Sequence, residues 1–377
     1  MHGSIRLGTI AGISIDLHFT WFIIFAVVAL VITAGLPGIA PGIPPGLQWG
    51  LGIGVALVFF ASLVLHELAH SLVAKRLGIG ISGITLFIFG GVSRMTSEPK
   101  SAGDELKMAI VGPATSALLG VVFLALWVAA VAAGAAPAVR FGLHWLGLMN
   151  LFLAGFNLLP GFPLDGGRVL RAIIWSATGD LRHATYIAST AGQGVAYSLM
   201  AAGILALFGR IPRIPAANGW LLLVVGWFLL DAARSSYQQQ VLRSALSGVR
   251  VRDMMTPEVV TVPPDVSLQQ AVDEYFLRLN HAAFPVTEGP HLAGMLSLAH
   301  VRQVPREQWG HTRVADVVER LDQSHFVRPG DDAWEALAAM AGADRGRLLV
   351  VEGTELVGII SRTNIMRFLR TKIELGV

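Results

Sequence analysis

Long apolar stretches separated by short polar connections fill the first 235 residues of the chain. About 20 apolar residues in an α-helix cross the hydrocarbon core of a bilayer. We therefore predict six transmembrane helices, at residues 19–36, 49–74, 108–133, 145–159, 187–208 and 220–230. After Asp231 polar residues appear, and charged residues become frequent from Arg250 onward. The pattern predicts a helical membrane domain at residues 1–235, a linker at 236–248 and a polar C-terminal domain from residue 249.

Composition supports a membrane protein that is surrounded by a lipid bilayer. Hydrophobic residues make up 54% of the chain and charged residues only 14%, which lies outside the range of ordinary soluble domains. The net charge is only +3 and the basic residues gather near span ends, which argues against a nucleic-acid partner. Because the chain has no cysteine, His, Asp and Glu are its only strong candidate metal ligands.

The distribution of basic residues predicts the orientation in the cell membrane. The second connection contains several of them, and the fourth contains Arg168, Arg171 and Arg182, whereas the first connection has no charge. Basic residues favour cytoplasmic connections. We therefore predict that both termini and the C-terminal domain are cytoplasmic; the basic residues of the second connection are Lys75, Arg76, Arg94, Lys100 and Lys107.

An HExxH motif, His66-Glu67-Leu68-Ala69-His70, lies at the end of the second predicted span. Residues four apart on a helix are rotated by only about 40°, so both imidazoles can bind one zinc ion while Glu67 faces a water molecule. Polar groups at membrane depth are costly and usually functional. The motif therefore predicts a zinc site within the membrane, with Glu67 as its general base.

A catalytic zinc site needs a third protein ligand, and Asp165 is the best candidate. It belongs to residues 157–168, NLLPGFPLDGGR, where two prolines and three glycines interrupt the fourth span. Broken helices are tolerated at membrane depth where they line a cavity. We expect Asp165 to turn toward the two histidines, and Asn157 to hydrogen-bond a substrate carbonyl or oxyanion.

The segment at residues 79–95 follows the motif and is rich in Gly, Ile, Leu, Phe and Val, which predicts short β-strands. An unpaired strand edge there can hold an unwound substrate by β-augmentation. The alternative is a re-entrant connector without a binding role.

HELAH and NLLPGFPLDGGR, in this order, resemble the two motifs of the site-2 protease family of intramembrane metalloproteases. The resemblance implies that His66, His70 and Asp165 bind one zinc ion per chain, that Glu67 is the base and that Asn157 assists catalysis. It also implies a membrane-embedded hairpin with Gly90 and Gly91 in a glycine-rich turn that contacts substrate. The implied substrate is a transmembrane protein, such as a membrane-bound anti-sigma factor or a precursor.

The C-terminal domain is a tandem repeat of about 60 residues, with halves at 249–310 and 311–377. Val251-Arg252-Asp253 opens the first half and Val314-Ala315-Asp316 the second, and each half ends in a strand pair that finishes with Ser297 or Ser361. This α/β domain resembles a pair of cystathionine-β-synthase (CBS) domains. The resemblance implies a homodimer through the pair and an adenosine-nucleotide site in which the hydroxyls of Ser297 and Ser361 contact phosphate. His300 and Asn364 replace the carboxylate expected to hold ribose. The alternative is a purely structural pair.

Three classes of function are compatible with these observations. The first is a zinc endopeptidase that cleaves transmembrane segments and is modulated by the CBS pair. The second is a CBS-regulated transporter or channel whose intramembrane polar residues form an ion path. An inactive scaffold is a third. The spacing of the two histidines favours the protease, because transport does not require it.

Overall fold

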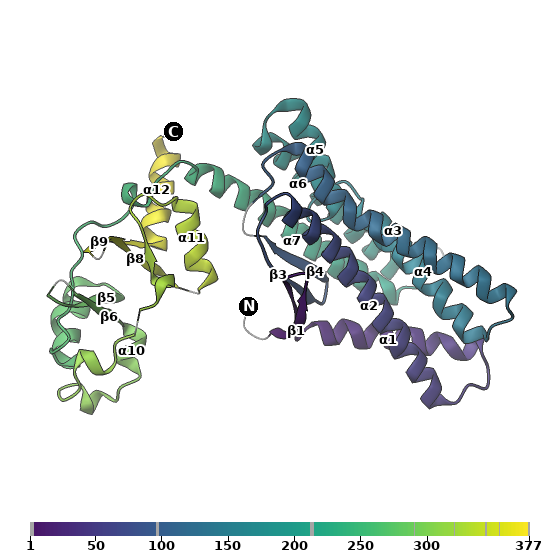
Figure 1. Cartoon of the computed structure of the whole chain (residues 1–377), viewed down its shortest axis with the longest axis horizontal. Coiled ribbons are helices and arrows are strands. Elements are labelled where there is room, and N and C mark those ends of the chain that lie inside the picture. The colour runs from purple at the N-terminus through teal and green to yellow at the C-terminus, as the bar shows by residue number, and fades with distance from the viewer. Residues whose placement is uncertain are drawn as a thin grey trace. The chain divides into compact units, whose positions relative to one another are not determined.

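A computed structural model describes residues 4–95, 98–211, 215–289, 291–319, 321–343, 345–353 and 355–375. The chain divides into two compact units, Met1–Gln240 and Val241–Val377 (Figure 1). The two units are described separately below.

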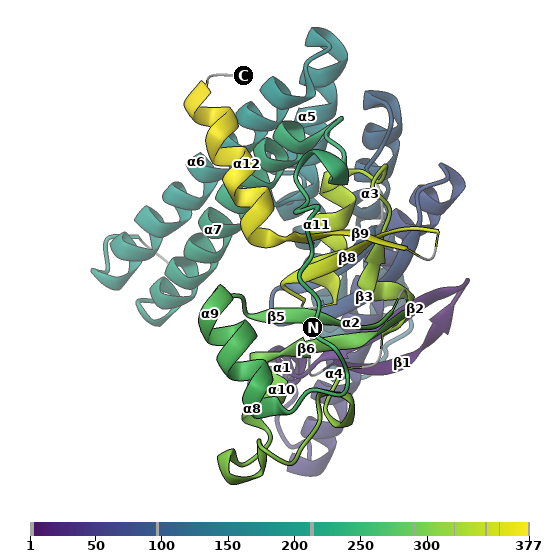
Figure 2. The same cartoon turned by 90° about the vertical axis from the view of Figure 1, so that its left-hand side faces the viewer.

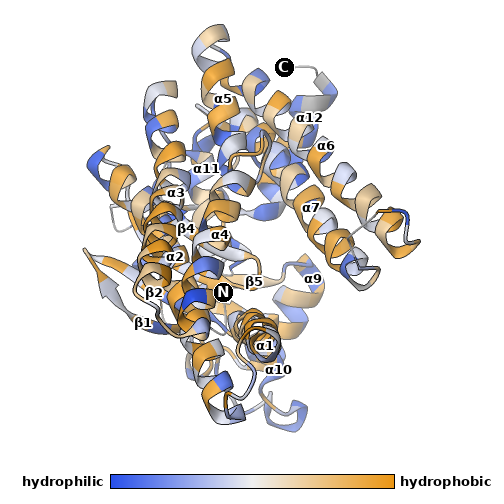
Figure 3. Ribbon diagram, turned by 90° about the vertical axis from the view of Figure 1, so that its right-hand side faces the viewer, coloured by the Kyte–Doolittle hydropathy of each residue, from blue (hydrophilic) through white to orange (hydrophobic). Residues whose placement is uncertain are grey.

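Six helices in the described residues are long and apolar enough to cross a membrane, which confirms the predicted number. Large apolar side chains point away from the protein along them, for example Leu118 and Phe152, which are 64% and 63% exposed. Figure 3 shows many hydrophobic residues along these helices. Exposed apolar faces on helices of this length are typical of contact with lipid. The protein is therefore a multi-pass membrane protein; the spans are α1 (Trp21–Ile39), α2 (Pro45–Arg76), α3 (Ala102–Ala132), α4 (Pro137–Asn157), α6 (Leu181–Leu207) and α7 (Ala217–Leu246).

Two of these helices are much longer than their predicted spans. Helix α4 begins at Pro137 rather than residue 145, and α7 continues to Leu246 rather than ending at residue 230. Apolar patterning detects only the part of a helix that faces hydrocarbon, whereas polar residues such as Arg140 extend the same helix. Residues 236–246, within the predicted linker, are the last turns of α7.

Helix α5 (Asp165–Thr178) was not predicted. It has 14 residues and is about 21 Å long, too short to cross a bilayer. It follows the Pro- and Gly-rich segment and packs beside α3 and α6. Its first residue is Asp165, so the break after α4 places the candidate ligand at the start of a new helix.

A four-stranded sheet lies beside the helices, in the order β1 (Ser4–Ile10), β2 (Ile13–His18), β3 (Ile81–Phe87), β4 (Gly90–Met95). The predicted hairpin at residues 79–95 is confirmed as β3 and β4, but Gly90 and Gly91 begin β4 rather than form the turn, which contains Ile88 and Phe89. The N-terminal hairpin of β1 and β2 was not predicted. Because β4 pairs only with β3 among the described residues, it is an edge strand in this part of the chain.

Long-range contacts hold this sheet to α2 and fix its strands. Asp16 of β2 pairs with Arg94 of β4 across the intervening strand. At the end of α2, Lys75 donates a hydrogen bond of 2.9 Å to the backbone oxygen of Ala11. An apolar cluster joins α1, α2 and the sheet; its buried members include Trp21, Phe60, Leu63, Ile84 and Leu86. The sheet is therefore a fixed part of the membrane unit.

The second unit consists of two similar halves. Each half has a strand pair after a helical segment, and Figure 2 shows these strands face on. The first half contains α8 (Leu268–Gln270), a π-helical segment (Ala271–Phe276), α9 (Leu277–Leu279), β5 (Ala283–Glu288), β6 (His291–Ser297) and α10 (Leu298–Arg302). The second contains β7 (Phe326–Val327), α11 (Ala333–Gly342), β8 (Arg347–Glu352), β9 (Glu355–Ser361) and α12 (Arg362–Leu375). The α/β repeat is confirmed.

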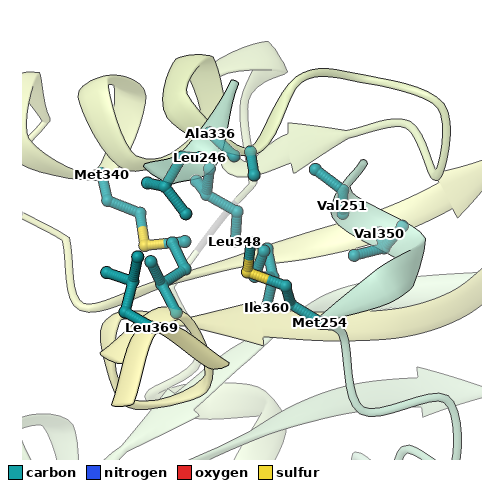
Figure 4. Close-up of a cluster of buried hydrophobic side chains, with 11 residues drawn as sticks. Leu246, Val251, Met254, Ala336, Met340, Leu348, Val350, Ile360 and Leu369 are labelled. Atoms are coloured by element: carbon teal, nitrogen blue, oxygen red, sulfur yellow. The ribbon is translucent and has the colours of Figure 1, made fainter. Parts of the chain in front are cut away.

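Each half completes the core of the other. Val251, which opens the first half, is buried among residues of the second half (Figure 4). Val314, which opens the second half, is buried in the core of the first. Backbone bridges are reciprocal as well, because Arg250 pairs with Asp332 and Arg313 with Ser267. Since neither half can fill its core alone, the repeat folds as a pair.

Candidate metal centre

Two imidazoles on α2 supply the first ligand atoms of the site. His66 and His70 lie one turn apart, and His66 is only 2% exposed. Both face Gly112 of α3, where an added Cβ would lie 2.1 Å from Nε2 of His70 and 2.8 Å from Nε2 of His66. A side chain at position 112 would therefore occupy the space beside both nitrogens.

Asp165 reaches the histidines because of the broken segment between α4 and α5. Gly161 approaches Gly192 of α6 so closely that a Cβ at position 161 would lie 2.3 Å from the Cα of Gly192. The backbone N–H of Phe162 donates to the oxygen of Ala188, also on α6, at 3.1 Å, and the Phe162–Pro163 peptide bond is cis. These contacts fix the segment against α6 and bring Asp165 back to α2.

Three possible metal-ligand atoms, one from each of these residues, lie close together. Oδ2 of Asp165 lies 3.2 Å from Nε2 of His66 and 3.1 Å from Nε2 of His70, and the two nitrogens are 3.2 Å apart. Four ligands around zinc at about 2.0–2.1 Å are separated from each other by about 3.3 Å. The three distances therefore fit three corners of a tetrahedron around zinc, and three protein ligands are the number typical of a catalytic zinc site. No other group of this kind is found among the described residues.

The outer nitrogens of both rings are held by α3. Nδ1 of His70 lies 2.6 Å from the backbone oxygen of Met108, and Nδ1 of His66 lies 2.9 Å from Oγ of Ser116. Because a carbonyl oxygen can only accept, Nδ1 of His70 carries a proton, which leaves Nε2 as the metal-binding nitrogen of the neutral ring. Two imidazole nitrogens and a carboxylate oxygen are a donor set that zinc commonly takes, so the three residues fit zinc.

The sequence did not lead us to predict these contacts between α3 and the two histidines. Met108, Gly112 and Ser116 are spaced by four residues, and therefore lie on one face of α3. Gly112 and Ser116 are small residues four apart inside a predicted span. Because small residues let helices approach closely, this spacing could have indicated that α3 packs against the HExxH helix.

Glu67 faces the sheet. The hydroxyl of Ser93, on β4, lies 3.4 Å from Oε2 of Glu67 and 3.0 Å from the hydroxyl of Ser71. A Cβ on Gly91 would lie 2.5 Å from Cγ of Glu67. Residues 91 and 93 lie on one face of the strand, because side chains alternate along it. The edge strand therefore passes directly over the glutamate.

For two other predicted site residues, the described part of the chain shows no side-chain contact with these ligands. Asn157 is the last residue of α4 and is half-buried, and its side chain makes no hydrogen bond that the described part of the chain shows. An added Cβ on Gly90 would meet no atom within 4 Å. The roles predicted for Asn157 and Gly90 stay predictions.

Comparisons with known proteins agree with this geometry. Residues 54–142 and 128–201 match the model of peptidase family M50. Rip3 of Mycobacterium tuberculosis is 35% identical over 372 residues, which cover 98% of this chain and 93% of that protein. The chain belongs to peptidase family M50. MJ0392 of Methanocaldococcus jannaschii is 33% identical to this M50 peptidase over 97% of its chain and 96% of MJ0392.

Both relatives bear the name of zinc metalloproteases, which implies zinc as the metal. A solved structure, the site-2 protease from Methanocaldococcus jannaschii, is 34% identical and covers 62% of this M50 peptidase and 95% of that chain, with a TM-score of 0.42. Residues 251–307 and 314–371 match the CBS domain, so the M50 peptidase carries a CBS pair.

In the CBS pair, His300 and Asn364 stand where carboxylates were expected. Their side chains hydrogen-bond to the backbone at the start of their own helices. Nδ1 of His300 accepts from the backbone N–H of Ser297 at 3.2 Å, and Oδ1 of Asn364 accepts from that of Ser361 at 3.1 Å. Each side chain thus caps the start of α10 or α12. Nucleotide binding stays a prediction.

Proposed function

We propose that this M50 peptidase is a zinc endopeptidase that hydrolyses peptide bonds in or near transmembrane segments of other proteins. The observation that carries the proposal is the convergence of His66, His70 and Asp165 beside Glu67, inside a bundle of membrane-spanning helices. A hydrolytic site at that depth has access to substrates that soluble proteases do not reach.

The chemistry is divided between the metal and the chain. Zinc held by the three residues would supply Lewis acidity, which lets hydroxide form near neutral pH and polarises a scissile carbonyl. Glu67 would accept the proton of the attacking water and return it to the leaving amine. Ser93 orients the carboxylate of Glu67 from the strand side. Asn157 would donate a hydrogen bond to the substrate carbonyl.

The edge strand supports a way to hold the substrate. A transmembrane helix hides its carbonyls in hydrogen bonds, so the cleaved segment must first unwind. Strand β4 passes over Glu67 and is the last strand of the sheet in the described residues, and an extended segment can pair with such an edge. The proposed substrate class is a single-span membrane protein, such as a membrane-bound anti-sigma factor or a precursor. Gly90 and Gly91 would lie beside it.

Substitution of Glu67 tests the activity directly. Glu67→Gln keeps the three metal ligands but removes the base, so we expect one zinc per chain and cleavage slowed by about 10²–10⁴-fold. Asp165→Ala should lose both zinc and cleavage, because it removes a ligand. The measurements are metal analysis of protein purified in detergent and cleavage of a generic single-span substrate.

Full turnover by the Glu67→Gln variant would disprove the role of Glu67. Zinc-free protein that carries an ion current or moves a solute would instead support the transporter, and zinc-loaded wild-type protein without cleavage would support the scaffold.

We further propose that the termini and the CBS pair are cytoplasmic and that the CBS pair modulates cleavage. Helix α7 supports a connection, since it joins the two units. Within the membrane unit, its Phe228 stacks on Phe89 at the hairpin turn, with ring centroids 4.0 Å apart. Within the CBS unit, its last residue, Leu246, is fully buried in a core cluster. A homodimer through the CBS pair belongs to the same proposal.

A further inference from the structure

We propose that a buried ion pair between Glu105 and Arg171 positions Asp165 for metal binding. This inference rests on the proposed function, and it assigns positioning roles to two residues outside both motifs. Glu105 lies in the first turn of α3, and Arg171 lies on α5, the helix that Asp165 begins.

Both side chains of the pair are buried, and Glu105 has few alternative hydrogen-bond partners. Glu105 is 0% exposed and Arg171 is 8% exposed. Nε of Arg171 donates to Oε1 of Glu105 at 2.7 Å, and Nη2 donates to the same oxygen. The other oxygen, Oε2, has no hydrogen-bond partner in the part of the chain that the structure describes. Arg171 is therefore the cation that compensates the charge of Glu105.

Arg171 also holds the segment that leads into Asp165. Its guanidinium lies 5.1 Å from the centre of the Phe162 ring, a cation–π distance. Phe162 is buried, and its backbone N–H donates to Ala188 of α6. Arg171 thus contacts both the broken segment before Asp165 and the neighbouring helix α3.

Glu105 lies beside the part of α3 that orients a histidine. Met108, whose oxygen accepts from Nδ1 of His70, follows Glu105 by three residues and lies on the same side of the helix. One end of the ion pair is therefore on the helix that orients the His70 ring. The other end is on the helix that carries Asp165.

The metal ligands come from two separate helices, so their spacing depends on what fixes α5 against α3 and α2. Neither Glu105 nor Arg171 is a catalytic residue, because in the described part of the chain neither pairs or hydrogen-bonds with the three ligand side chains. They act through Asp165, as outer residues around a metal commonly do, and loss of such support typically weakens metal binding about 10–100-fold.

The test compares zinc affinity with thermal stability in the full chain. Single substitutions leave a buried charge unpaired, so the principal variant is the double replacement Glu105→Leu with Arg171→Met, since apolar residues of similar size often replace a buried pair without loss of stability. We expect a melting temperature near that of the wild type, a zinc Kd raised about 10–100-fold in competition with a chelator, and cleavage restored by added zinc.

A control removes a different Arg–carboxylate pair of the membrane unit. Asp16→Leu with Arg94→Met eliminates a pair within the sheet, where Asp16 is buried and the Arg94 side chain is partly exposed, and it should leave the zinc Kd unchanged. Arg171→Lys serves as a second variant that keeps the buried charge. Lys lacks the planar fork and the contact with Phe162, so we expect a zinc Kd between those of the wild type and the double variant.

Two results would overturn the inference: a wild-type zinc Kd in the double variant, or an equal rise in the control. If the double variant does not fold, Arg171→Lys decides, and a wild-type Kd there would refute positioning. Wild-type protein that binds no zinc would instead refute the proposed function.

Discussion

At the scale of single residues, the metal site depends on the glycine at position 112 as much as on the three ligand residues. The two Nε2 atoms and the Asp165 oxygen leave room for an ion because position 112 has no side chain. The motif residues themselves are not enough, because their lone pairs must also be aimed. Met108 and Ser116 do this from α3, through the backbone in one case and a hydroxyl in the other.

Gly112→Ala should weaken zinc binding. The new Cβ would lie 2.1 Å from Nε2 of His70, so the ring or α3 must move, and we expect the zinc Kd to rise at least about tenfold. Gly103→Ala is the matched control on the same helix, where the nearest atom to the added Cβ is 3.9 Å away. Chelator competition measures both. Equal zinc affinity of the two variants would show that Gly112 does not shape the site.

At the scale of elements, α2 supplies the HExxH residues, and strand β4 and the broken segment after α4 complete the site. Strand β4 places alternate residues over Glu67, and the segment after α4 lets Asp165 start a helix at the site. Both arrangements depend on partners distant in sequence, since β3 pairs with the N-terminal hairpin and the broken segment packs on α6.

Gly91→Ala should slow cleavage without removing zinc. Its Cβ would collide with Glu67, 2.5 Å from Cγ, and displace the carboxylate from the water that it must deprotonate. We expect kcat to fall by about 10-fold or more, with one zinc still bound per chain. The neighbouring Val92 is exposed and lies on the opposite face of the strand, so Val92→Ala should keep wild-type kcat. A Gly91→Ala enzyme as fast as wild type would show that β4 does not approach Glu67 during catalysis.

At the scale of the whole molecule, the chain combines a membrane unit that contains the metal ligands with a CBS pair whose halves complete each other's cores. Helix α7 belongs to both units, so a change in the packing of the pair has a direct covalent route to the helix that contacts the hairpin turn.

A membrane-impermeant adenosine nucleotide should change the cleavage rate when added to inside-out vesicles and have no effect on right-side-out vesicles. The reason is that the proposed orientation exposes the CBS pair only on the cytoplasmic side. Ser297→Ala with Ser361→Ala should abolish the response, because it removes both hydroxyls that the CBS resemblance places at phosphate. A response from the opposite side would refute the orientation, and none from either side would refute nucleotide control.

Much of the architecture follows from local sequence. Apolar runs of sufficient length can satisfy their backbone in a bilayer only as helices, so six spans were predictable, and the repeat in residues 249–377 identified a paired α/β domain. HExxH determined the relation of His66, Glu67 and His70, because helix geometry fixes residues four apart.

Tertiary structure decided what depends on contacts between distant segments. The N-terminal hairpin joins β3 in a sheet, and α5 begins at Asp165 because Gly161 and Phe162 pack on α6. The pairing of Glu105 with Arg171, and the contacts of Met108 and Ser116 with the histidines, join residues 38 to 66 positions apart. Helical period and hydropathy describe neighbours along the chain, whereas these contacts arise only when separate helices pack together.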